Sequence, residues 1–498
     1  MKCNDQAVEC VKPRLTAGKV CVEIIACLLY NLIVISVLTP YGIWDAGYPR
    51  SRGMKREIGR WLKRMEREHP RLRRMIRALF RGYLRLRYHA QTFRVETDPK
   101  TVLFASYEGR SYSDSPRALF EYMLQCGQFA DYTMVWGFRS QVDARQRKLN
   151  RLVNQKLASG SIAAAPQVVA VRYDSPAWRR YLARAGTWIV NYEPPEDMVP
   201  KKEQVFLQTW HGTPMKRLGW DLEHLDDDLY SVKDLRRRYI QEAKRFTFFL
   251  SPSPFASACF RSAWNMDAHG RGNIILEEGY PRNDRLFSAT PEETEHIRAR
   301  VLGHYYPEYA RAEVRRTIIL YAPTYRPEEK GPDAPSWQPA LDLPRLHLDL
   351  GEDYIFLIRA HYFLSDGLDF EKYKGFLFDV SGEEEIAELF LISDMLITDY
   401  SSVMFDYANL SRPMIFYMYD LDQYRDRSNG FYFDPEEELP GPIVRSQKEL
   451  TGAIRDISAA GTCLDPQYAQ RYRCFHEKFN PRDDGGASGR VVNRVFGR

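Results

Sequence analysis

A histidine at the end of an apolar run offers the clearest catalytic chemistry in the sequence. Residues 208–216 are QTWHGTPMK, in which His211 and Gly212 follow a predicted strand. Ligands of open α/β sheets bind just beyond the carboxyl ends of strands, and an imidazole accepts a proton near neutral pH. Thr213 and Lys216 add a hydroxyl and a positive charge that suit a phosphate. We expect a functional histidine here; a histidine that only caps a helix is the plainer alternative.

A second apolar run ends in the same way. The strand predicted at residues 354–359 runs straight into Arg359 and His361. Each half of the chain therefore supplies one histidine at a strand end. If the two halves fold as separate domains, His211 and His361 can face each other across a cleft. This pairing is more specific than either residue alone.

Two neighbouring serines mark a third candidate site. The strand predicted at residues 395–398 delivers Asp399, and Ser401 and Ser402 stand where a helix should begin. Helix N-termini present free N–H groups to phosphate, and the two hydroxyls add further donors. Asp406 lies further along the same predicted helix. Serine at this place is also a common helix cap, and capping is compatible with phosphate binding.

Polar turns elsewhere complete the candidate set. One follows a predicted strand, one leads into a predicted helix and one is the turn at residues 279–284, and each is equally well explained as a plain surface turn. Their candidate residues are Gly109, Arg110, Ser111, Arg282, Thr324 and Arg326. The sequence has no Walker loop, no G-x-G-x-x-G after a strand, no G-x-S-x-G and no H-E-x-x-H. We therefore expect His, Arg and Ser side chains to handle phosphate without a metal or a cofactor.

Short apolar runs alternate with helical patterns from about residue 100 onward, which predicts parallel sheets covered on both faces. Two such series predict an α/β protein with two doubly wound, Rossmann-like domains facing a cleft. We place the domains at residues 96–290 and 291–498, after an N-terminal extension at 1–95. The predicted strands are 101–106, 132–138, 167–173, 187–191, 204–210 and 246–251, then 317–322, 354–359, 395–398 and 414–417.

The N-terminal extension carries most of the positive charge. The whole chain has a net charge of +5, but residues 50–87 alone hold 15 Lys and Arg against three acids. Apolar residues recur there at helical spacing and Pro70 interrupts the run, which predicts one or two basic amphipathic helices. Such helices suit an anionic membrane surface. Nucleic acid is the weaker alternative because no stacking platform accompanies the charge, and a solvated helix docked on the body is the third.

An apolar stretch precedes the basic one. Residues 20–38 are about long enough to span a bilayer, with Glu23 near one end. If they span it, the positive-inside rule places the rest of the chain in the cytoplasm; an ordinary buried helix is the alternative. Eight scattered cysteines without a C-x-x-C pair also favour a reducing compartment.

Several segments resemble one known family, and they occur in that family's order. The sequence is similar to the CDP-glycerol glycerophosphotransferases, the teichoic acid primases and polymerases, over about residues 100–480. The resemblance implies a GT-B architecture, with the acceptor on the first domain and the CDP-linked donor in the second. The segments are SYEGRSYSDSPRALFEYM, QTWHGTPMKRLG, GYPRNDRLF, YAPTYR, RAH and DVSGEEEIAELFLISDMLITDYSSVMFDYANLSRPMIFY.

The resemblance also implies roles for individual residues. His211 becomes the candidate base that activates an acceptor hydroxyl, and His361 becomes a second essential histidine near the donor phosphates. Gly109, Arg110 and Ser111 would lie on the acceptor side. The residues that would bind the donor phosphates or shape their pocket are Gly212, Thr213, Lys216, Arg282, Thr324, Arg326, Arg359, Asp399, Ser401, Ser402 and Asp406.

The implied reaction moves glycerol phosphate, or a related polyol phosphate, from a CDP-linked donor to a lipid-linked wall or capsule polymer. An acceptor hydroxyl attacks the phosphorus that carries the polyol, and CMP leaves. The donor would be CDP-glycerol or CDP-ribitol, and the site of action the cytoplasmic face of a bacterial membrane. Two alternatives stay open: a GT-B glycosyltransferase that uses a sugar nucleotide, and a scaffold of wall synthesis without catalytic activity.

Overall fold

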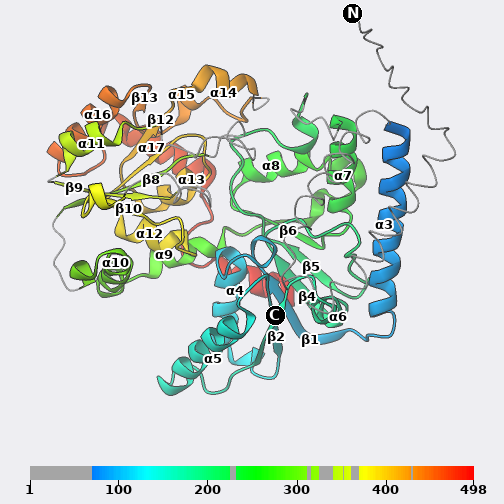
Figure 1. Cartoon of the computed structure of the whole chain (residues 1–498). Helices are drawn as coiled ribbons and strands as arrows, with labels where there is room; N and C mark the ends of the chain where they lie inside the picture. The colour runs from blue at the N-terminus through cyan, green and yellow to red at the C-terminus, as the bar shows by residue number, and fades with distance from the viewer. Residues whose placement is uncertain are drawn as a thin grey trace, which may run out of the picture. The chain divides into compact units, whose positions relative to one another are not determined.

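The computed structural model describes residues 70–224, 231–310, 316–324, 340–351, 353–359, 370–427 and 430–497. By its internal contacts the chain divides into two units, Met1–Met75 and Ile76–Arg498. The second unit contains two parallel sheets with helices packed around them (Figure 1). The predicted apolar segment at 20–38 and the basic residues 50–69 lie outside the described residues.

The first sheet has seven strands, all paired in parallel, in the order β3-β2-β1-β4-β5-β6-β7. Along β1, Val102 and Phe104 lie in one buried cluster, and Leu103 and Ala105 lie in another. Because successive side chains point to opposite faces, both faces of this sheet are covered. The strands are β1 (Asp98–Ala105), β2 (Thr133–Phe138), β3 (Gln167–Arg172), β4 (Ala185–Val190), β5 (Val205–Gln208), β6 (Phe248–Ser251) and β7 (Ile275–Glu277).

Helices connect these strands and cover the first sheet. Three of them begin at a serine whose side chain accepts a hydrogen bond from the first turn, namely Ser175, Ser231 and Ser253. A long helix, α3 (Pro70–Thr92), precedes β1. The connecting helices are α4 (Asp114–Gln125), α5 (Val142–Ala158), α6 (Pro176–Arg184), α7 (Val232–Ala243) and α8 (Pro254–Ala263).

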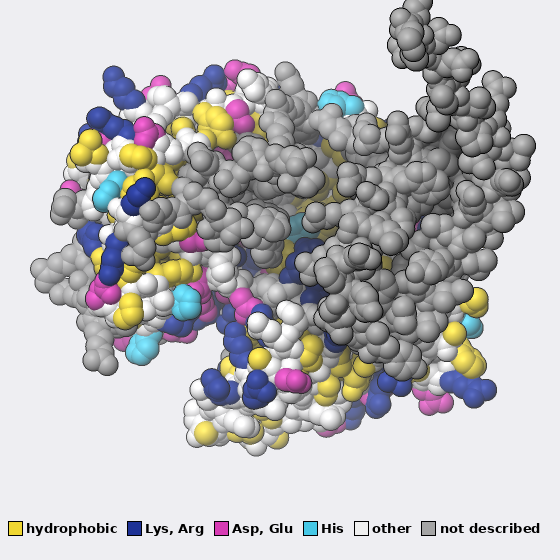
Figure 2. Space-filling model, viewed as in Figure 1, with side chains coloured by type: hydrophobic (Ala, Val, Ile, Leu, Met, Phe, Trp, Pro, Cys, Tyr) yellow, Lys and Arg dark blue, Asp and Glu magenta, His cyan; other side chains and the backbone are white. Residues whose placement is uncertain are grey.

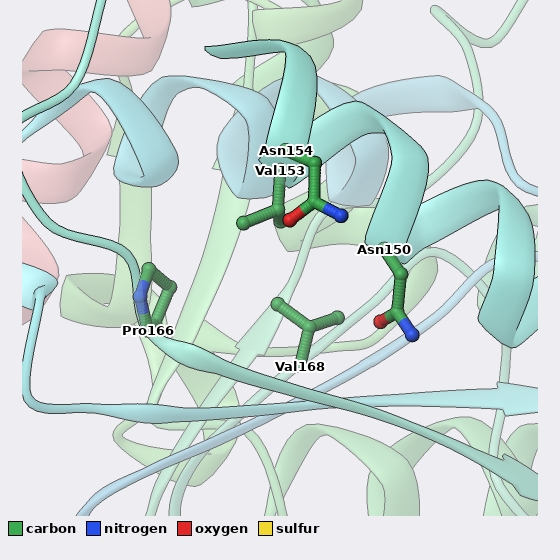
Figure 3. A pocket seen from close by; sticks show the side chains of 5 residues that line it. All are labelled: Asn150, Val153, Asn154, Pro166 and Val168. Atoms are coloured by element: carbon green, nitrogen blue, oxygen red, sulfur yellow. The ribbon is translucent and has the colours of Figure 1, made fainter. Parts of the chain in front are cut away.

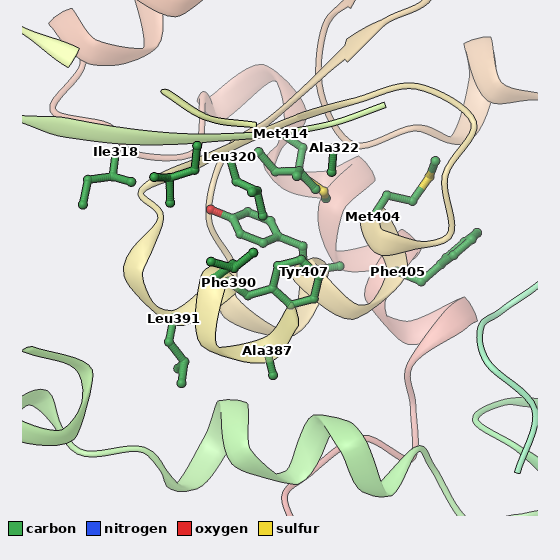
Figure 4. Close-up of a cluster of buried hydrophobic side chains, with 14 of the residues drawn as sticks. Ile318, Leu320, Ala322, Ala387, Phe390, Leu391, Met404, Phe405, Tyr407 and Met414 are labelled. Carbon is green, nitrogen blue, oxygen red and sulfur yellow. The ribbon is translucent and has the colours of Figure 1, made fainter. Parts of the chain in front are cut away.

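The second sheet has six parallel strands in the order β10-β9-β8-β11-β12-β13. Ile318 and Leu320 of β8 lie in the apolar cluster drawn in Figure 4, and Ile319 and Tyr321 lie in a separate cluster. The strands are β8 (Thr317–Ala322), β9 (Tyr354–Ile358), β10 (Leu377–Asp379), β11 (Met395–Thr398), β12 (Met414–Tyr417) and β13 (Ile443–Val444). The helices are α9 (Asp284–Ser288), α10 (Pro291–Tyr305), α11 (Leu343–Leu350), α12 (Ile386–Ile392), α13 (Val403–Tyr407), α14 (Leu421–Arg427), α15 (Pro435–Glu438), α16 (Gln447–Ala459) and α17 (Pro466–Phe479).

Both sheets reverse their strand order at one point. In the first sheet, β1 has β2 on one side and β4 on the other; in the second, β8 lies between β9 and β11. Ligands of open α/β sheets bind beyond the carboxyl ends of the strands at such a switch point. In the first domain, residues 106–113 follow β1 and 191–198 follow β4, and 209–217 follow the next strand, β5; in the second domain, 323–324 follow β8 and 399–402 follow β11.

The structure confirms the predicted α/β class with two parallel sheets. All ten predicted strands are present, and β7, β10 and β13 were not predicted. Among the described residues, no helix is both long and apolar enough to cross a membrane. Figure 2 shows Lys and Arg side chains interspersed with Asp and Glu over the visible described surface. Four cysteines in the described ranges are free: Cys126, Cys259, Cys463 and Cys474.

The last helix, α18 (Ala487–Phe496), returns to the first domain. It packs against α4, and Val491, Val492 and Val495 are buried in the same cluster as residues of β1 and β2. Its first two N–H groups donate to the carboxylate of Asp284 at 3.0 and 2.7 Å. The division of the chain at residue 290 stays a prediction. The packing of α18 shows that the core of the first sheet also takes residues that follow the second sheet in the chain.

Candidate active site

His211 lies just beyond β5, where the backbone adopts an unusual conformation. Trp210 has a φ of +53°, which a bulky residue adopts only when its surroundings impose it. The centroids of the His211 and Trp210 rings are 4.2 Å apart, and the Tyr107 ring from the loop after β1 lies 6.2 Å from the imidazole. Solvent still reaches the imidazole. The strand end therefore presents an oriented and accessible histidine.

A backbone carbonyl fixes the tautomer of this histidine. His211 Nδ1 lies 2.9 Å from the carbonyl oxygen of Asn191, the first residue after β4. A carbonyl oxygen only accepts, so Nδ1 carries the proton and Nε2 keeps its lone pair. Although solvent reaches one side of the ring, the protein atoms around it lower the pKa of His211 by desolvation, against the opposing effects of the Asn191 carbonyl and Asp114. The ring is therefore neutral at pH 7.

Gly212 brings the second domain to this histidine. A β-carbon at position 212 would lie 2.6 Å from Oγ of Ser402 and 2.9 Å from its Cβ, so no larger residue fits without a shift. Ser402 precedes α13, and its hydroxyl makes no capping hydrogen bond to that helix. Ser401 and Ser402 are both partly exposed. The candidate base of the first domain and the candidate phosphate ligands of the second are thus neighbours.

Asp399 links two loops of the second domain through hydrogen bonds. Its Oδ1 accepts hydrogen bonds from the N–H and the hydroxyl of Thr324 at 2.8 and 2.6 Å, and from the N–H of Tyr400 at 2.6 Å. Thr324 follows β8 and Asp399 follows β11, so these bonds join the two strand ends at the switch point. Arg359, directly after β9, donates to the carbonyl oxygen of Glu383 at 2.6 Å. These three predicted residues therefore lie along one edge of the sheet.

Arg282, for which a role as phosphate ligand stays a prediction, is buried between two carboxylates. Its guanidinium lies 3.2 Å from Oδ2 of Asp114, the first residue of α4, and 2.8 Å from Oδ2 of Asp406 in α13. Burial alone would raise the pKa of Asp114, but Arg282 and the Tyr107 hydroxyl outweigh it and lower that pKa. At Asp406 the effect of burial is larger than the opposing effects of Arg282 and Asn283, so the pKa of Asp406 is raised. Arg282 therefore joins the two domains, and Asp406 serves as its partner.

The polar network continues on both sides of this ion pair. Nδ2 of Asn283 donates to Oδ1 of Asp406 at 2.9 Å and to Oδ2 of Asp483 at 2.6 Å. Burial raises the pKa of Asp483 to about 6. In the first domain, the Tyr107 hydroxyl donates to Oδ2 of Asp114 at 2.5 Å. The network thus runs without a break from the loop after β1 into the second domain.

The predicted acceptor-side residues lie in the loop after β1, two to four positions beyond Tyr107. Gly109 is buried and has a φ of +79°, which favours glycine. Arg110 is exposed and forms an ion pair of 3.0 Å with Glu108. The hydroxyl of Ser111 lies 2.7 Å from that of Ser113. Tyr107 of the same loop lies beside the candidate base, whereas Gly109 packs against Tyr173 and the end of β2.

Lys216 lies where the two domains pair through their backbones. It forms an antiparallel bridge with Phe431 of the second domain. Its ammonium lies 5.1 Å from the centroid of the Tyr424 ring, which stacks on Tyr400 with centroids 3.8 Å apart. Thr213, four residues after Thr209 on the same segment, is buried. The positive charge expected from the sequence is therefore held at the seam between the domains.

His211, Gly212, Lys216, Arg282, Ser402 and Asp406 meet at this seam, whereas two predicted site residues cannot be placed. His361 and Arg326 lie outside the described residues, so the pairing of His211 with His361 stays a prediction. A separate pocket lies between α5 and β3 (Figure 3), and no predicted site residue lines it. Its lining is Asn150, Val153, Asn154, Pro166 and Val168.

Three residues of the site were missed by the sequence analysis: Tyr107, Asp114 and Asn191. Asn191 follows an apolar strand directly, which is the same signal that selects His211, so it was open to prediction. The contact of Asp114 with Arg282 joins distant parts of the chain and has no local signal. Nine non-glycine residues in the described ranges have positive φ, and four of them lie in or beside the segments after β1 and β5. Such strain clusters at functional sites.

Glu242 is a buried carboxyl in the same domain. Nε of Arg238 donates to it at 2.9 Å and the indole N–H of Trp264 at 3.3 Å. Burial, together with the neighbouring Glu193 carboxylate, raises the pKa of Glu242 above its ordinary 4.5. The folded state therefore keeps a proton that the unfolded chain releases. The protonated Glu242 therefore stabilises the folded state fully below pH 4.5, and this stabilisation is lost as pH rises from 4.5 through the raised pKa.

We expect Glu242→Gln to flatten the decline of stability with rising pH, since the amide keeps the protonated shape and cannot ionise. Urea unfolding at pH 5.5 and pH 8 measures the free energy of unfolding of both proteins. The loss between the two pH values should be smaller in the variant. Glu437→Gln, the same change at an exposed residue, serves as the control. Equal losses in wild type and Glu242→Gln would contradict the raised pKa.

Residues 86–497 match the protein family described as CDP-Glycerol:Poly(glycerophosphate) glycerophosphotransferase. The chain is 35% identical over 412 residues to the teichoic acid poly(glycerol phosphate) polymerase of Bacillus subtilis (strain 168), a match that covers 81% of this chain and 49% of that protein. It is 34% identical over 396 residues to the teichoic acid glycerol-phosphate transferase of Staphylococcus aureus (strain NCTC 8325 / PS 47), covering 79% of this chain and 92% of that protein. The chain thus spans about half the length of the first relative and most of the second.

A solved structure of the wall teichoic acid polymerase TagF has the same fold. It superposes with a TM-score of 0.70 at 31% identity, covering 85% of this chain and 96% of that one. The likeness confirms the GT-B-like arrangement of the two sheets. The matched family region contains both sheets and every described residue of the candidate site. The chain belongs to the CDP-glycerol:poly(glycerophosphate) glycerophosphotransferase family.

Proposed function

We propose that this protein transfers glycerol phosphate from CDP-glycerol to the end of a poly(glycerol phosphate) chain in teichoic acid synthesis. The observation that carries the proposal is the approach of Ser402 to Gly212. This approach places Gly212, the residue after the neutral His211, against a serine hydroxyl at the switch point of the second sheet. Both relatives described above are named for glycerol phosphate chemistry, which supports the choice of donor and acceptor.

In the proposed reaction, His211 acts as the general base. Its Nε2 takes the proton of the acceptor hydroxyl, whose oxygen forms a bond to the glycerol-bearing phosphorus of CDP-glycerol. The bond from that phosphorus to the bridging oxygen breaks, and CMP leaves with the electron pair. Ser401 and Ser402 donate to the phosphate oxygens, and Lys216 offsets their charge. Catalysis of phosphoryl transfer rests largely on such positioning and charge stabilisation.

A donor screen tests this proposal. Purified protein, CDP-glycerol and a short lipid-linked glycerol phosphate acceptor should release CMP and extend the acceptor by glycerol phosphate units, which mass spectrometry resolves. CDP-ribitol and UDP-sugars are assayed in parallel. Release of UDP without any CMP would replace the proposal with a glycosyltransferase, and no release from any donor would favour a scaffold without catalytic activity.

We also infer that the protein works on an anionic membrane surface, at its cytoplasmic face. Leu79, Leu86 and Phe93 are 63%, 69% and 59% exposed. They are spaced seven residues apart along α3 and just past its end, so they share one face. Exposed apolar side chains on a helix rich in arginine are typical of segments that lie in a membrane interface. The free cysteines of the described residues support a reducing compartment.

Replacing Leu79, Leu86 and Phe93 together by serine should weaken binding to vesicles of phosphatidylglycerol by about 100-fold. Fully burying one such side chain contributes about 1.5–3 kcal/mol, and partial insertion of three gives a loss of this order. Co-sedimentation at increasing lipid concentration measures the affinity. Leu348→Ser, at a 77% exposed leucine of α11, is the matched control and should bind as wild type does. Undiminished binding of the triple variant would exclude this face as the membrane contact.

A further inference from the structure

Asn191 connects the ends of three strands around the candidate base. It follows β4, its backbone carbonyl accepts the Nδ1 proton of His211 at 2.9 Å, and its side-chain Oδ1 accepts the N–H of Tyr107 at 2.8 Å. Tyr107 belongs to the loop after β1, and His211 to the segment after β5. Asn191 is completely buried. One side chain and one carbonyl therefore set the relation of the imidazole to the neighbouring loop.

The backbone that carries this carbonyl is itself held firmly. Arg179 forms a fully buried ion pair of 2.9 Å with Asp197, at the far end of the same loop. Arg245 donates to the carbonyl oxygens of Pro194 and Pro195 at 3.1 and 2.9 Å. A hydrogen-bond acceptor fixed in this way by supporting contacts orients a histidine more strictly than a mobile one.

The side chain of Asn191 is not explained by stability alone. Its Nδ2 is buried and has no hydrogen-bond partner within the described residues, which is unfavourable. An aspartate of the same shape would also accept the Tyr107 N–H and would leave no donor unsatisfied, but it would bury a carboxylate beside the imidazole. Tyr107 itself has a φ of +47°, so its loop is strained and depends on the hydrogen bond that it donates.

We propose that Asn191 is the positioning residue of the base: its carbonyl fixes the tautomer of His211, its amide side chain fixes the Tyr107 loop, and its lack of charge keeps the imidazole unprotonated. The proposal rests on the proposed function, in which His211 removes the proton of the acceptor hydroxyl. It adds a residue that touches neither substrate and acts through the histidine.

The charge argument follows from the groups around the imidazole. A carboxylate favours the protonated ring and an arginine disfavours it. Solvent reaches the His211 ring, so one additional carboxylate should raise its pKa by about one unit, the lower end of the usual effect. The ionisable groups that face the ring are Asp114 from α4, Glu193 from the loop after β4, Arg282 before α9, and Tyr107, whose hydroxyl stays neutral because burial raises its pKa well above 10.

The test compares Asn191→Asp with wild type by kinetics and by NMR of protein labelled with ¹⁵N-histidine. The signals of the ring nitrogens report both the tautomer and the pKa of His211. They are assigned to His211 because they are missing from the spectrum of His211→Asn. We expect the Nδ1–H tautomer in both proteins, and in Asn191→Asp a pKa about one unit higher, with the acidic limb of kcat/KM displaced equally. Asn154→Asp adds the same charge on the exposed side of α5 and should change neither.

Asn191→Ala separates positioning from charge. The backbone carbonyl stays in this variant, but the hydrogen bond to the Tyr107 N–H is lost, so kcat should fall about tenfold. The KM for CDP-glycerol should not change, because the donor is proposed to bind in the other domain. The acidic limb of kcat/KM should also stay at the same pH. An Nε2–H tautomer in wild type, or an unmoved ring pKa in Asn191→Asp, would overturn the inference. A ring pKa that rises while the acidic limb stays fixed would show that Asn191 controls the imidazole but that His211 is not the base. That result would refute the proposed mechanism, and with it the role of Asn191 in catalysis.

Discussion

Asparagine in place of His211 is expected to lower turnover by about 10²–10⁴-fold, the usual contribution of a general base. The amide can still donate to the carbonyl of Asn191, so the loop should keep its shape. It offers no nitrogen lone pair to the acceptor hydroxyl. The KM for CDP-glycerol should change little, because the donor is proposed to bind in the second domain. CMP release under saturating substrates measures the effect, and near-normal turnover would remove His211 from the mechanism.

The pH profile gives an independent reading of the same residue. A general base works in its unprotonated form, so kcat/KM of the wild type should fall as pH decreases through the pKa of His211. Desolvation lowers that pKa below 6.5, and the rate should therefore be level through neutral pH and decline only in more acidic solution. The acidic limb should disappear in His211→Asn. His304→Asn, at an exposed histidine of α10, is the control and should retain it.

Methionine in place of Arg282 should be the most destabilising single change in the site. It leaves the buried carboxylates of Asp114 and Asp406 without their shared counter-charge. Removing one partner of a buried ion pair costs about 3–5 kcal/mol of unfolding free energy. Lysine should be intermediate, because one ammonium cannot reproduce the forked contacts of the guanidinium. Urea unfolding measures all three proteins.

Two comparisons show whether the buried charges are responsible. Arg110→Met removes an exposed ion pair with Glu108 and should cost less than about 1 kcal/mol. Combining Arg282→Met with Asp114→Asn and Asp406→Asn removes all three charges of this ion-paired group and should recover part of the loss. If Arg282→Met were as stable as Arg110→Met, the guanidinium would not join the domains.

The order of the elements was predictable because each core strand is a short, nearly continuous apolar run. The central strands β8, β11 and β12 begin and end where the sequence predicts them, at residues 317–322, 395–398 and 414–417. The three strands that were missed are β7, β10 and β13, which are two or three residues long and lie at the edges of the sheets. A run of that length has no periodicity to detect. Its pairing depends on a neighbouring strand that is already in place.

Candidate site residues could be predicted where a polar side chain directly follows an apolar strand. They could not be predicted where their role depends on contacts between the two domains. His211, Asp399 and Ser402 were predicted because each follows an apolar run, and their roles stay proposals. Arg282 was assigned to phosphate because a lone arginine in a turn gives no sign of the carboxylates that will surround it. Asp114 of the first domain and Asp406 of the second approach it only after both sheets have formed.

The return of α18 to the first sheet has a consequence for synthesis of the chain. Val491, Val492 and Val495 fill the core beside α4, yet the whole second sheet lies between α4 and these residues in the chain. Until α18 has been synthesised, α4 lacks the apolar contacts that α18 supplies. The first domain therefore cannot reach its final packing before the second sheet has been made, and its nascent form should be a substrate for chaperones that bind exposed apolar surface.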